Sequence, residues 1–150
     1  MPKIIFIILV FFIIFFIYRI FYSSKFQSLN IDIKGQSFNL EVAKSLTQIT
    51  KGLSNRTSLC PNCGMIFVFP SPQILSFWMK DTLIPLDIIF LDSKSQIVNF
   101  VTAEPEPNVP DNKLILFQSK SPANFAIEIP AGTIQKLNLT PGDQINLYGL

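Results

Sequence analysis

The residues best suited to chemistry lie in and around one stretch, Phe77 to Asp92. Asp87 sits inside an otherwise apolar run, and an unpaired carboxylate in such surroundings is costly unless it is paired or hydrogen-bonded. Lys80 and Arg56 are the available cations, so we expect one of them to compensate Asp87. The pair could act as a general acid and base or hold a charged ligand; the alternative is a partly buried ion pair that fixes strand register.

Trp78 shares one face of its predicted strand with Lys80, because side chains alternate between the faces of a strand. It is either a stacking platform for a sugar or peptide, or part of the core. Together, Arg56, Trp78, Lys80 and Asp87 make up the predicted ligand-binding face. The expected ligand is a small molecule, a glycan or an envelope partner.

Cys60 and Cys63 have the spacing of a redox motif. A thioredoxin-like site would need the first cysteine at a helix N-terminus within an α/β pattern, which this sequence lacks. Zinc would need two further ligands, which only a dimer could supply here. In an oxidising compartment the pair is expected to close a small disulfide that stiffens the loop before Gly64. Free thiols, redox work and metal binding are the alternatives.

No metal or cofactor is predicted. The chain has no histidine, so it lacks the usual general base and the commonest metal ligand. Asp81, Asp87 and Asp92 could offer oxygen ligands to a hard cation. They bracket the apolar run instead of lying at the close intervals of a calcium loop, so we do not assign them a metal.

The charge distribution argues against nucleic acid as a partner. The chain of 150 residues has a formal net charge of +2, and suits one domain plus an appendage. Residues 1–25 carry three basic residues and no acidic one, which leaves nine bases against ten acids in the remainder. A near-neutral body lacks the basic patch that binds nucleic acid.

An apolar segment at the N-terminus predicts a membrane anchor. The run from Ile4 to Tyr18 is unbroken, and it reaches Tyr22 if Arg19 extends its charged end toward the headgroups. A cleaved signal peptide is a rival interpretation, but a small-x-small cleavage site is missing. A buried core helix is a third, disfavoured because helices apolar on every face are rare in small domains.

These observations divide the chain into a transmembrane anchor at residues 1–22, a polar tether at 23–28 and a globular domain at 29–150. The lipid bilayer would be contacted through residues 4–22. Basic residues flank both ends of the anchor, so the positive-inside rule is close to a tie. Because an anchor at the extreme N-terminus usually exports the remainder, we predict a single-pass protein whose domain is extracytoplasmic.

The globular part reads as eight or nine short strands separated by turn signals, which favours an all-β sandwich or barrel. A central strand is expected at Met65–Phe69, ended by Pro70. Residues 75–80 and 86–91 are expected to form a hairpin across the connector Asp81–Pro85. Alternation from Phe125 to Ile129 places Glu128 in water.

Other local patterns predict two short helices and a final strand. Ser45 to Lys51 has helical spacing, with Gly52 at its C-terminus. Residues 133–137 offer one helical turn with Thr133 as the cap. The proline-rich segment at residues 104–113 is expected to be a loop without helix or strand. Residues 145–147 are expected to form the last strand.

Several groups of residues occur in an order and spacing that resembles the domain of unknown function 192 family (uncharacterised protein family 0127). The resemblance covers about Leu40 to Leu147. It implies a compact β-sandwich or jelly-roll-like barrel, and frequent attachment to a signal peptide or membrane anchor. It does not imply a catalytic activity. Ser54, Asp81 and Phe117 depart from the pattern, where Met, Asn and Tyr are common. The groups that carry the resemblance are Gly52-Leu53, Arg56, Gly64-Met65-Ile66-Phe67, Phe77-Trp78-Met79-Lys80, Ile84-Pro85-Leu86-Asp87 and Pro141-Gly142-Asp143.

The sequence thus predicts a membrane-anchored, extracytoplasmic β-domain that binds a small ligand, a glycan or an envelope partner. The alternative is an enzyme that uses Asp87 as acid or base with Lys80 or Arg56. A thiol-redox role for Cys60 and Cys63 is the third hypothesis.

Overall fold

The computed structural model of the protein describes residues 2–23 and 26–150. Helix α1 (Pro2–Ser23) precedes the body. Its side chains are described for residues 6–16, where they are apolar and mostly exposed. No helix in the part of the chain described with its side chains is long and apolar enough to cross a membrane. The predicted anchor and tether fall partly on residue 1 and residues 24–25, which lie outside the described residues.

The body is mostly β, as predicted, with few short helices. Its main sheet has six strands in the order β1-β2-β3-β8-β5-β6, and β4 and β7 form a separate two-stranded sheet. Neighbouring strands are antiparallel except for the parallel pair β2–β3. The large sheet is strongly curved but does not close into a barrel. The strands are β1 (Gln27–Ile33), β2 (Gln36–Ala43), β3 (Cys63–Gln73), β4 (Ser76–Phe77), β5 (Leu86–Leu91), β6 (Ile97–Ala103), β7 (Phe117–Gln118) and β8 (Ala123–Pro130).

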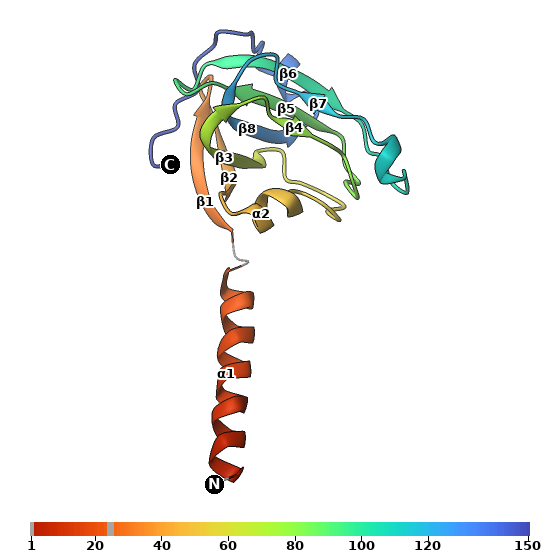
Figure 1. The fold of residues 1–150 in the computed structure, drawn as a ribbon. Helices are drawn as coiled ribbons and strands as arrows, with labels where there is room; N and C mark the ends of the chain where they lie inside the picture. Colours follow the sequence, from red (N-terminus) through yellow and green to blue (C-terminus); the bar gives the residue numbers. More distant parts are fainter. Residues whose placement is uncertain (1, 24–25) are drawn as a thin grey trace.

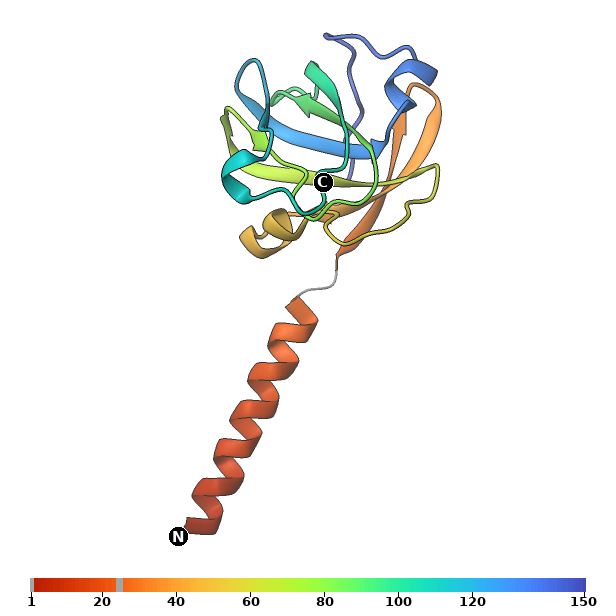
Figure 2. The same cartoon turned by 90° about the vertical axis from the view of Figure 1, so that its right-hand side faces the viewer.

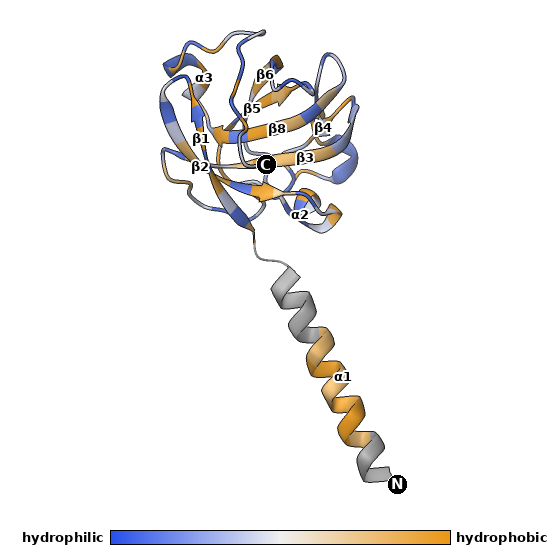
Figure 3. Ribbon diagram, turned by 90° about the vertical axis from the view of Figure 1, so that its left-hand side faces the viewer, coloured by the Kyte–Doolittle hydropathy of each residue, from blue (hydrophilic) through white to orange (hydrophobic). Residues whose placement is uncertain are grey.

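Both faces of the main sheet are covered by apolar side chains. All six residues of β5 are buried, and Figure 2 shows β8 crossing the middle of the curved sheet. Because side chains alternate along a strand, Ile89 and Ile127 enter one core cluster, whereas Ile88 and Ala126 enter the other. Figure 3 shows the apolar character of these central strands.

The second cluster contains the aromatic side chains that matter for the site. Phe77 packs edge-on against Phe67, with ring centroids 4.9 Å apart. It also packs against Phe90 at 5.7 Å. Leu53, which follows helix α2 (Leu46–Lys51), closes the same cluster. The loop after α2 and the strands β3 and β4 are therefore held together by one apolar core.

The predicted hairpin between residues 75–80 and 86–91 is wrong. Strand β4 pairs with β7 instead, and β5 lies between β6 and β8. A strand that is apolar on both faces belongs in the sheet interior. There, two long neighbours satisfy its backbone hydrogen bonds.

Two strand boundaries also differ from the prediction. Strand β3 continues past Pro70, because its register against β8 shifts between Val68 and Gln73, and prolines are tolerated at such irregularities. The expected last strand at residues 145–147 is not formed. Only Gln144 makes a bridge there, to Gln96.

Helix α2 confirms its local signals. The Ser45 side chain accepts a hydrogen bond from the Gln48 backbone N–H, and the Gln48 side chain accepts one from the Ser45 backbone N–H. At the other end of the helix, Gly52 has a positive φ of 47°. The proline-rich segment contains one short 3-10 turn, η1 (Asp111–Lys113), which the sequence did not suggest.

Helix α3 (Thr133–Lys136) is also present, but Thr133 is not its cap. The N-cap is Gly132, and the Thr133 hydroxyl donates to the Pro130 carbonyl at 2.6 Å.

Candidate functional site

The four residues predicted to form a ligand-binding face do not converge. Arg56 donates from its two terminal guanidinium nitrogens, Nη1 and Nη2, to the two carboxylate oxygens of Glu41, at 2.6 and 2.7 Å. Lys80 pairs with Asp111. The hydrogen bonds that Arg56 donates to Glu41 raise the pKa of Arg56, and the one that Lys80 donates to Asp111 raises the pKa of Lys80. Neither cation reaches Asp87, so the predicted ion pair is wrong.

Asp87 is satisfied by neutral donors. It is fully buried, and its Oδ1 accepts from the Thr102 hydroxyl at 2.6 Å. Its Oδ2 accepts from the backbone N–H of Ile134 at 2.8 Å, at the start of α3. Asp87 therefore ties α3 to the sheet and has no free oxygen with which to meet a ligand.

A pocket of about 320 Å³ lies on the other face of the sheet, between the end of α2 and the strands β3 and β4. This volume is in the range of small-ligand sites. A second hollow of about 490 Å³ lies along residues 144–148, but it holds no buried titratable group. The first pocket is lined by Ile49, Thr50, Lys51, Gly52, Leu53, Ser54, Phe67, Phe69, Gln73, Ile74, Leu75, Ser76, Phe77, Trp78, Thr82 and Glu128.

Trp78 is the one predicted site residue that lines this pocket. Its side chain is 44% exposed, so part of the ring is open to a ligand. The Lys80 ammonium lies 5.9 Å from the centroid of the Trp78 ring, within the range of a cation–π contact. Lys80 thus contacts Trp78, which lines the pocket, but Lys80 does not itself line the pocket.

Glu128 is the pocket residue that sequence reasoning missed. It is 5% exposed and lies on β8 directly opposite Met65 of β3 and Ile88 of β5. Both of these neighbours are buried and apolar. The prediction that Glu128 faces water is wrong, because β8 is covered on both faces and alternation cannot tell water from a second core. A lone acid in an apolar run, the signal used for Asp87, would have found it.

The Glu128 carboxyl has no partner among the described residues. None of the hydrogen bonds or ion pairs found there involves its oxygens, and burial alone raises its pKa to about 8. Asn124 Oδ1 is the one fully enclosed, unpaired side-chain polar atom in the described part of the chain. The Glu128 oxygens keep a small access to solvent, which the pocket provides. At pH 7 a pKa of about 8 leaves the Glu128 carboxyl mostly neutral and protonated.

Gly64 fixes the backbone beneath this carboxyl. A Cβ atom at Gly64 would overlap the carbonyl oxygen of Glu128, and would lie 2.8 Å from the side chains of Leu40 and Ile129. Only glycine allows β3 to approach β8 this closely. The position of Glu128 thus depends on a glycine, Gly64, on the neighbouring strand.

Two of the neutral polar side chains of the pocket, Ser54 and Thr82, are engaged in hydrogen bonds. The hydroxyls of Ser54 and Thr82 both donate to the Lys80 carbonyl, at 3.1 and 3.4 Å. Lys51 is the second titratable residue of the lining, and its ammonium lies 6.0 Å from the Phe26 ring centroid. Among the described residues, Lys51 makes no ion pair with Glu128.

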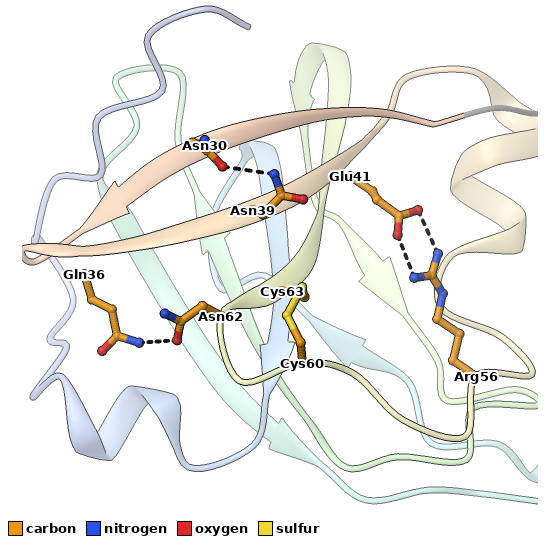
Figure 4. Close-up of a disulfide and its surroundings, with 8 residues drawn as sticks. All are labelled: Asn30, Gln36, Asn39, Glu41, Arg56, Cys60, Asn62 and Cys63. Carbon is orange, nitrogen blue, oxygen red and sulfur yellow. Dashed lines mark hydrogen bonds and ion pairs between the residues drawn. A yellow bond between two sulfur atoms is a disulfide. The ribbon is translucent and has the colours of Figure 1, made fainter.

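The two cysteines form the expected disulfide, Cys60–Cys63 (Figure 4). The loop between them is tied to β2. The Asn62 carbonyl accepts from the Asn39 N–H at 2.8 Å, and the Gln36 amide donates to Asn62 Oδ1 at 2.6 Å. The disulfide braces the start of β3 just before Gly64 and does not line the pocket.

No group of three or more His, Cys, Asp or Glu side chains suited to a metal ion occurs in the described part of the chain. Glu128 stands alone in the pocket lining as an acid. The site is therefore a pocket with one unpaired carboxyl.

Comparison with known proteins places this fold. Residues 29–147 match the model of the DUF192 family, described as Uncharacterized ACR, COG1430. The chain belongs to the DUF192 family. The resemblance seen in the sequence is thereby confirmed, and the family description states no activity.

Individual relatives agree with this membership. The chain is 33% identical over 87 residues to a UPF0127 protein of Thermococcus sibiricus; the match covers 57% of this chain and 51% of that protein. The chain thus spans about half the length of this curated relative.

Two solved structures have a similar fold, each with a TM-score of 0.69. One is a protein of unknown function from Novosphingobium aromaticivorans, 30% identical, with 81% of this chain and 84% of that chain covered. The other comes from Sinorhizobium meliloti and is described there as a proposed transcription regulator; it is 27% identical, with 81% and 95% covered.

Proposed function

We propose that this DUF192 protein is a membrane-anchored, extracytoplasmic binding domain whose ligand occupies the pocket above Glu128. One observation carries the proposal: a buried carboxyl that faces a pocket and has no partner among the described residues. Leaving a buried polar group unsatisfied is costly, and perturbed groups of this kind concentrate at functional sites. A bound ligand would supply the missing partner.

The volume of the pocket favours a small molecule or one sugar unit over a folded protein partner. An envelope protein could enter it only with a single side chain. Trp78 stays in the proposed site because it lines the pocket. Arg56 and Asp87 leave it, since both are engaged elsewhere.

Residues 1–22 are proposed as the anchor. Support comes from the unbroken apolar run from Ile4 to Tyr18 and from the exposed apolar side chains of residues 6–16. A reporter enzyme fused after Leu150 that is active only outside the cytoplasm would support the extracytoplasmic placement. Activity of a cytoplasmic reporter at the same position would contradict it.

The finer fold class, a β-sandwich of jelly-roll type, is also a proposal. It is supported by the curvature of the main sheet and by the apolar clusters on both of its faces. The parallel β2–β3 pair is the feature that a jelly roll does not predict.

A second candidate function is an enzyme in which Glu128, in place of Asp87, acts as acid or base. The pKa of about 8 favours it, because a group that titrates near neutral pH is suited to proton transfer. Against it, the structure offers no nucleophile hydrogen-bonded to Glu128 among the described residues.

The binding proposal can be tested through the single tryptophan of the chain, Trp78. A panel of small amines, sugars and carboxylates is added to the full chain in non-ionic detergent, and tryptophan fluorescence is recorded. At least one compound should change the emission of the wild type and of Glu104→Gln, an exposed control, but much less that of Glu128→Gln. If no compound class changes the emission, the pocket is not a binding site. Consumption of a bound compound that is lost in Glu128→Gln would favour the enzyme.

A further inference from the structure

We propose that the ligand of this pocket carries an ammonium group, which pairs with Glu128 while aromatic rings surround it. The inference rests on the proposed binding function and names the chemical class of the ligand. It depends on the composition of the pocket wall, on the single unpaired acid and on the position of the nearest cation.

The pocket wall is rich in aromatic rings. Phe67, Phe69, Phe77 and Trp78 all line it. Phe77 is nearly perpendicular to Phe67 and Phe69, at interplanar angles of 83° and 78°, so the rings form a corner instead of a stack. Cations are attracted to the faces of such rings, and aromatic cages commonly recognise quaternary ammonium groups.

The charge at the floor of the pocket selects the same ligand class. Glu128 is the only acid in the lining, and an anionic ligand would be repelled by it or would force it to stay protonated. A neutral sugar needs several convergent hydrogen-bonding groups. Two hydroxyls of the lining, those of Ser54 and Thr82, already donate to the Lys80 carbonyl, which leaves Thr50, Gln73 and Ser76 as the remaining neutral polar side chains. An ammonium group needs only the carboxylate and the rings.

The protein's own cation does not fill this position. Lys51 lines the pocket from α2, but its side chain is exposed and its ammonium lies over the Phe26 ring. The strands beside Glu128 contribute apolar Met65 and Ile88. Among the described residues, Lys51 is thus the only other titratable residue in the pocket lining. At the solvent-exposed mouth its repulsion is screened, whereas Glu128 acts in a desolvated site.

Binding of a permanent cation should release a proton from the protein. Burial raises the pKa of Glu128 to about 8, and a cation pairs only with the ionised form. Affinity for a quaternary ammonium, which itself does not titrate, should therefore rise about tenfold per pH unit below pH 7 and level off above pH 8.

The test compares choline with dimethylbutanol, its uncharged carbon analogue, and butylamine with butanol. Binding to the full chain in non-ionic detergent is measured by calorimetry and by Trp78 fluorescence at pH 6 and pH 9. At pH 9 at least one ammonium compound should bind more than tenfold tighter than its neutral analogue. Glu128→Gln should abolish this difference and the pH dependence, and Glu104→Gln should leave both unchanged.

The outcomes separate this inference from the proposed function. If the neutral analogues bind as tightly as the cations, the ligand class is wrong while the pocket remains a binding site. If neither cations, neutral analogues nor sugars bind, both proposals fail. Circular dichroism of Glu128→Gln checks that the variant is folded, so that a loss of binding can be assigned to the carboxyl.

The ammonium group could belong to a soluble amine or to a lipid headgroup. Nanodiscs of phosphatidylethanolamine are compared with nanodiscs of phosphatidylglycerol, and iodide quenching of Trp78 is measured in each. If Trp78 is protected from iodide quenching only in phosphatidylethanolamine nanodiscs, the ammonium group belongs to the lipid headgroup. Equal quenching, together with binding of free butylamine or choline, assigns a soluble amine.

Discussion

Asp87 and Glu128 lie on the adjacent strands β5 and β8 and point to opposite faces of the same sheet. Asp87 is paired with Ile129 and Glu128 with Ile88 in the strand register, so the two acids are offset by one residue. Asp87 meets two donors, whereas Glu128 meets only apolar neighbours and the pocket. The carboxyl group of Asp87 therefore stabilises the fold on one face of the sheet, whereas that of Glu128, in the pocket on the other face, has no partner among the residues that the structure describes.

The raised pKa of Glu128 makes the stability of the protein depend on pH. Its pKa rises from an ordinary value of 4.5 to about 8 on folding, so between these values the folded state holds a proton that the unfolded state has lost. The unfolding free energy should fall as pH rises from about 5 to 8, by at most about 1.4 kcal/mol per pH unit. Thermal denaturation followed by circular dichroism should show this slope in the wild type and in Glu104→Gln. A Glu128→Gln variant with the same slope would contradict it.

Replacing Asp87 should lower stability without affecting the pocket. Asp87→Ala leaves the Ile134 N–H and the Thr102 hydroxyl without their acceptor, which should cost about 3 kcal/mol. Asp87→Asn retains one acceptor and a donor for the Thr102 oxygen, so its loss should be nearer 1 kcal/mol. Urea denaturation measures both values. Equal losses for the two variants would show that the hydrogen bonds are not the cause.

Gly64→Ala should damage the floor of the pocket. The added methyl group overlaps the Glu128 carbonyl and crowds Leu40 and Ile129, so β3 must move away from β8. We expect a loss of about 1–3 kcal/mol together with a changed emission of Trp78. Gly35→Asn serves as the control, because Gly35 has open space around it and a positive φ that asparagine tolerates. An unchanged stability of Gly64→Ala would show that β3 and β8 are not packed this closely.

Removal of the disulfide should destabilise the fold but leave the pocket intact. The Cys60–Cys63 loop is short, so a variant with serine at both positions should lose about 2 kcal/mol. Tryptophan emission at neutral pH should be unchanged, since neither cysteine lines the pocket. Untreated protein should not react with maleimide. Rapid alkylation without prior reduction would instead indicate the thiol-redox role.

Local signals predicted the short elements better than the pairing of distant ones. The helical spacing from Ser45 to Lys51 and the following Gly52 carry the information for α2 within eight positions of the chain. The partners of Asp87 could not be found in this way, because they lie at residues 102 and 134 and are neutral. A buried carboxylate does not require a cation, because backbone and hydroxyl donors can satisfy its oxygens.

Glu128 shows the corresponding limit for the site. Alternation along β8 identified one buried face correctly, through Ile127 and Ile129. It could not reveal that the face with Ala126 is buried as well, because that depends on which strands cover it. The pocket itself is assembled from α2, β3, β4 and β8, so no single segment of the sequence contains it.

The position of β8 also governs when the body can fold. It separates β3 from β5 in the main sheet, yet it begins only at Ala123, long after both of them in the chain. Until β8 has been synthesised, β3 and β5 each lack one of their two neighbouring strands. Pairing between strands that are distant in the sequence slows folding. The main sheet can therefore be completed only after almost the whole chain has been synthesised. A chain cut short before Pro130 would leave the edges of β3 and β5 unpaired, and unpaired strand edges promote aggregation.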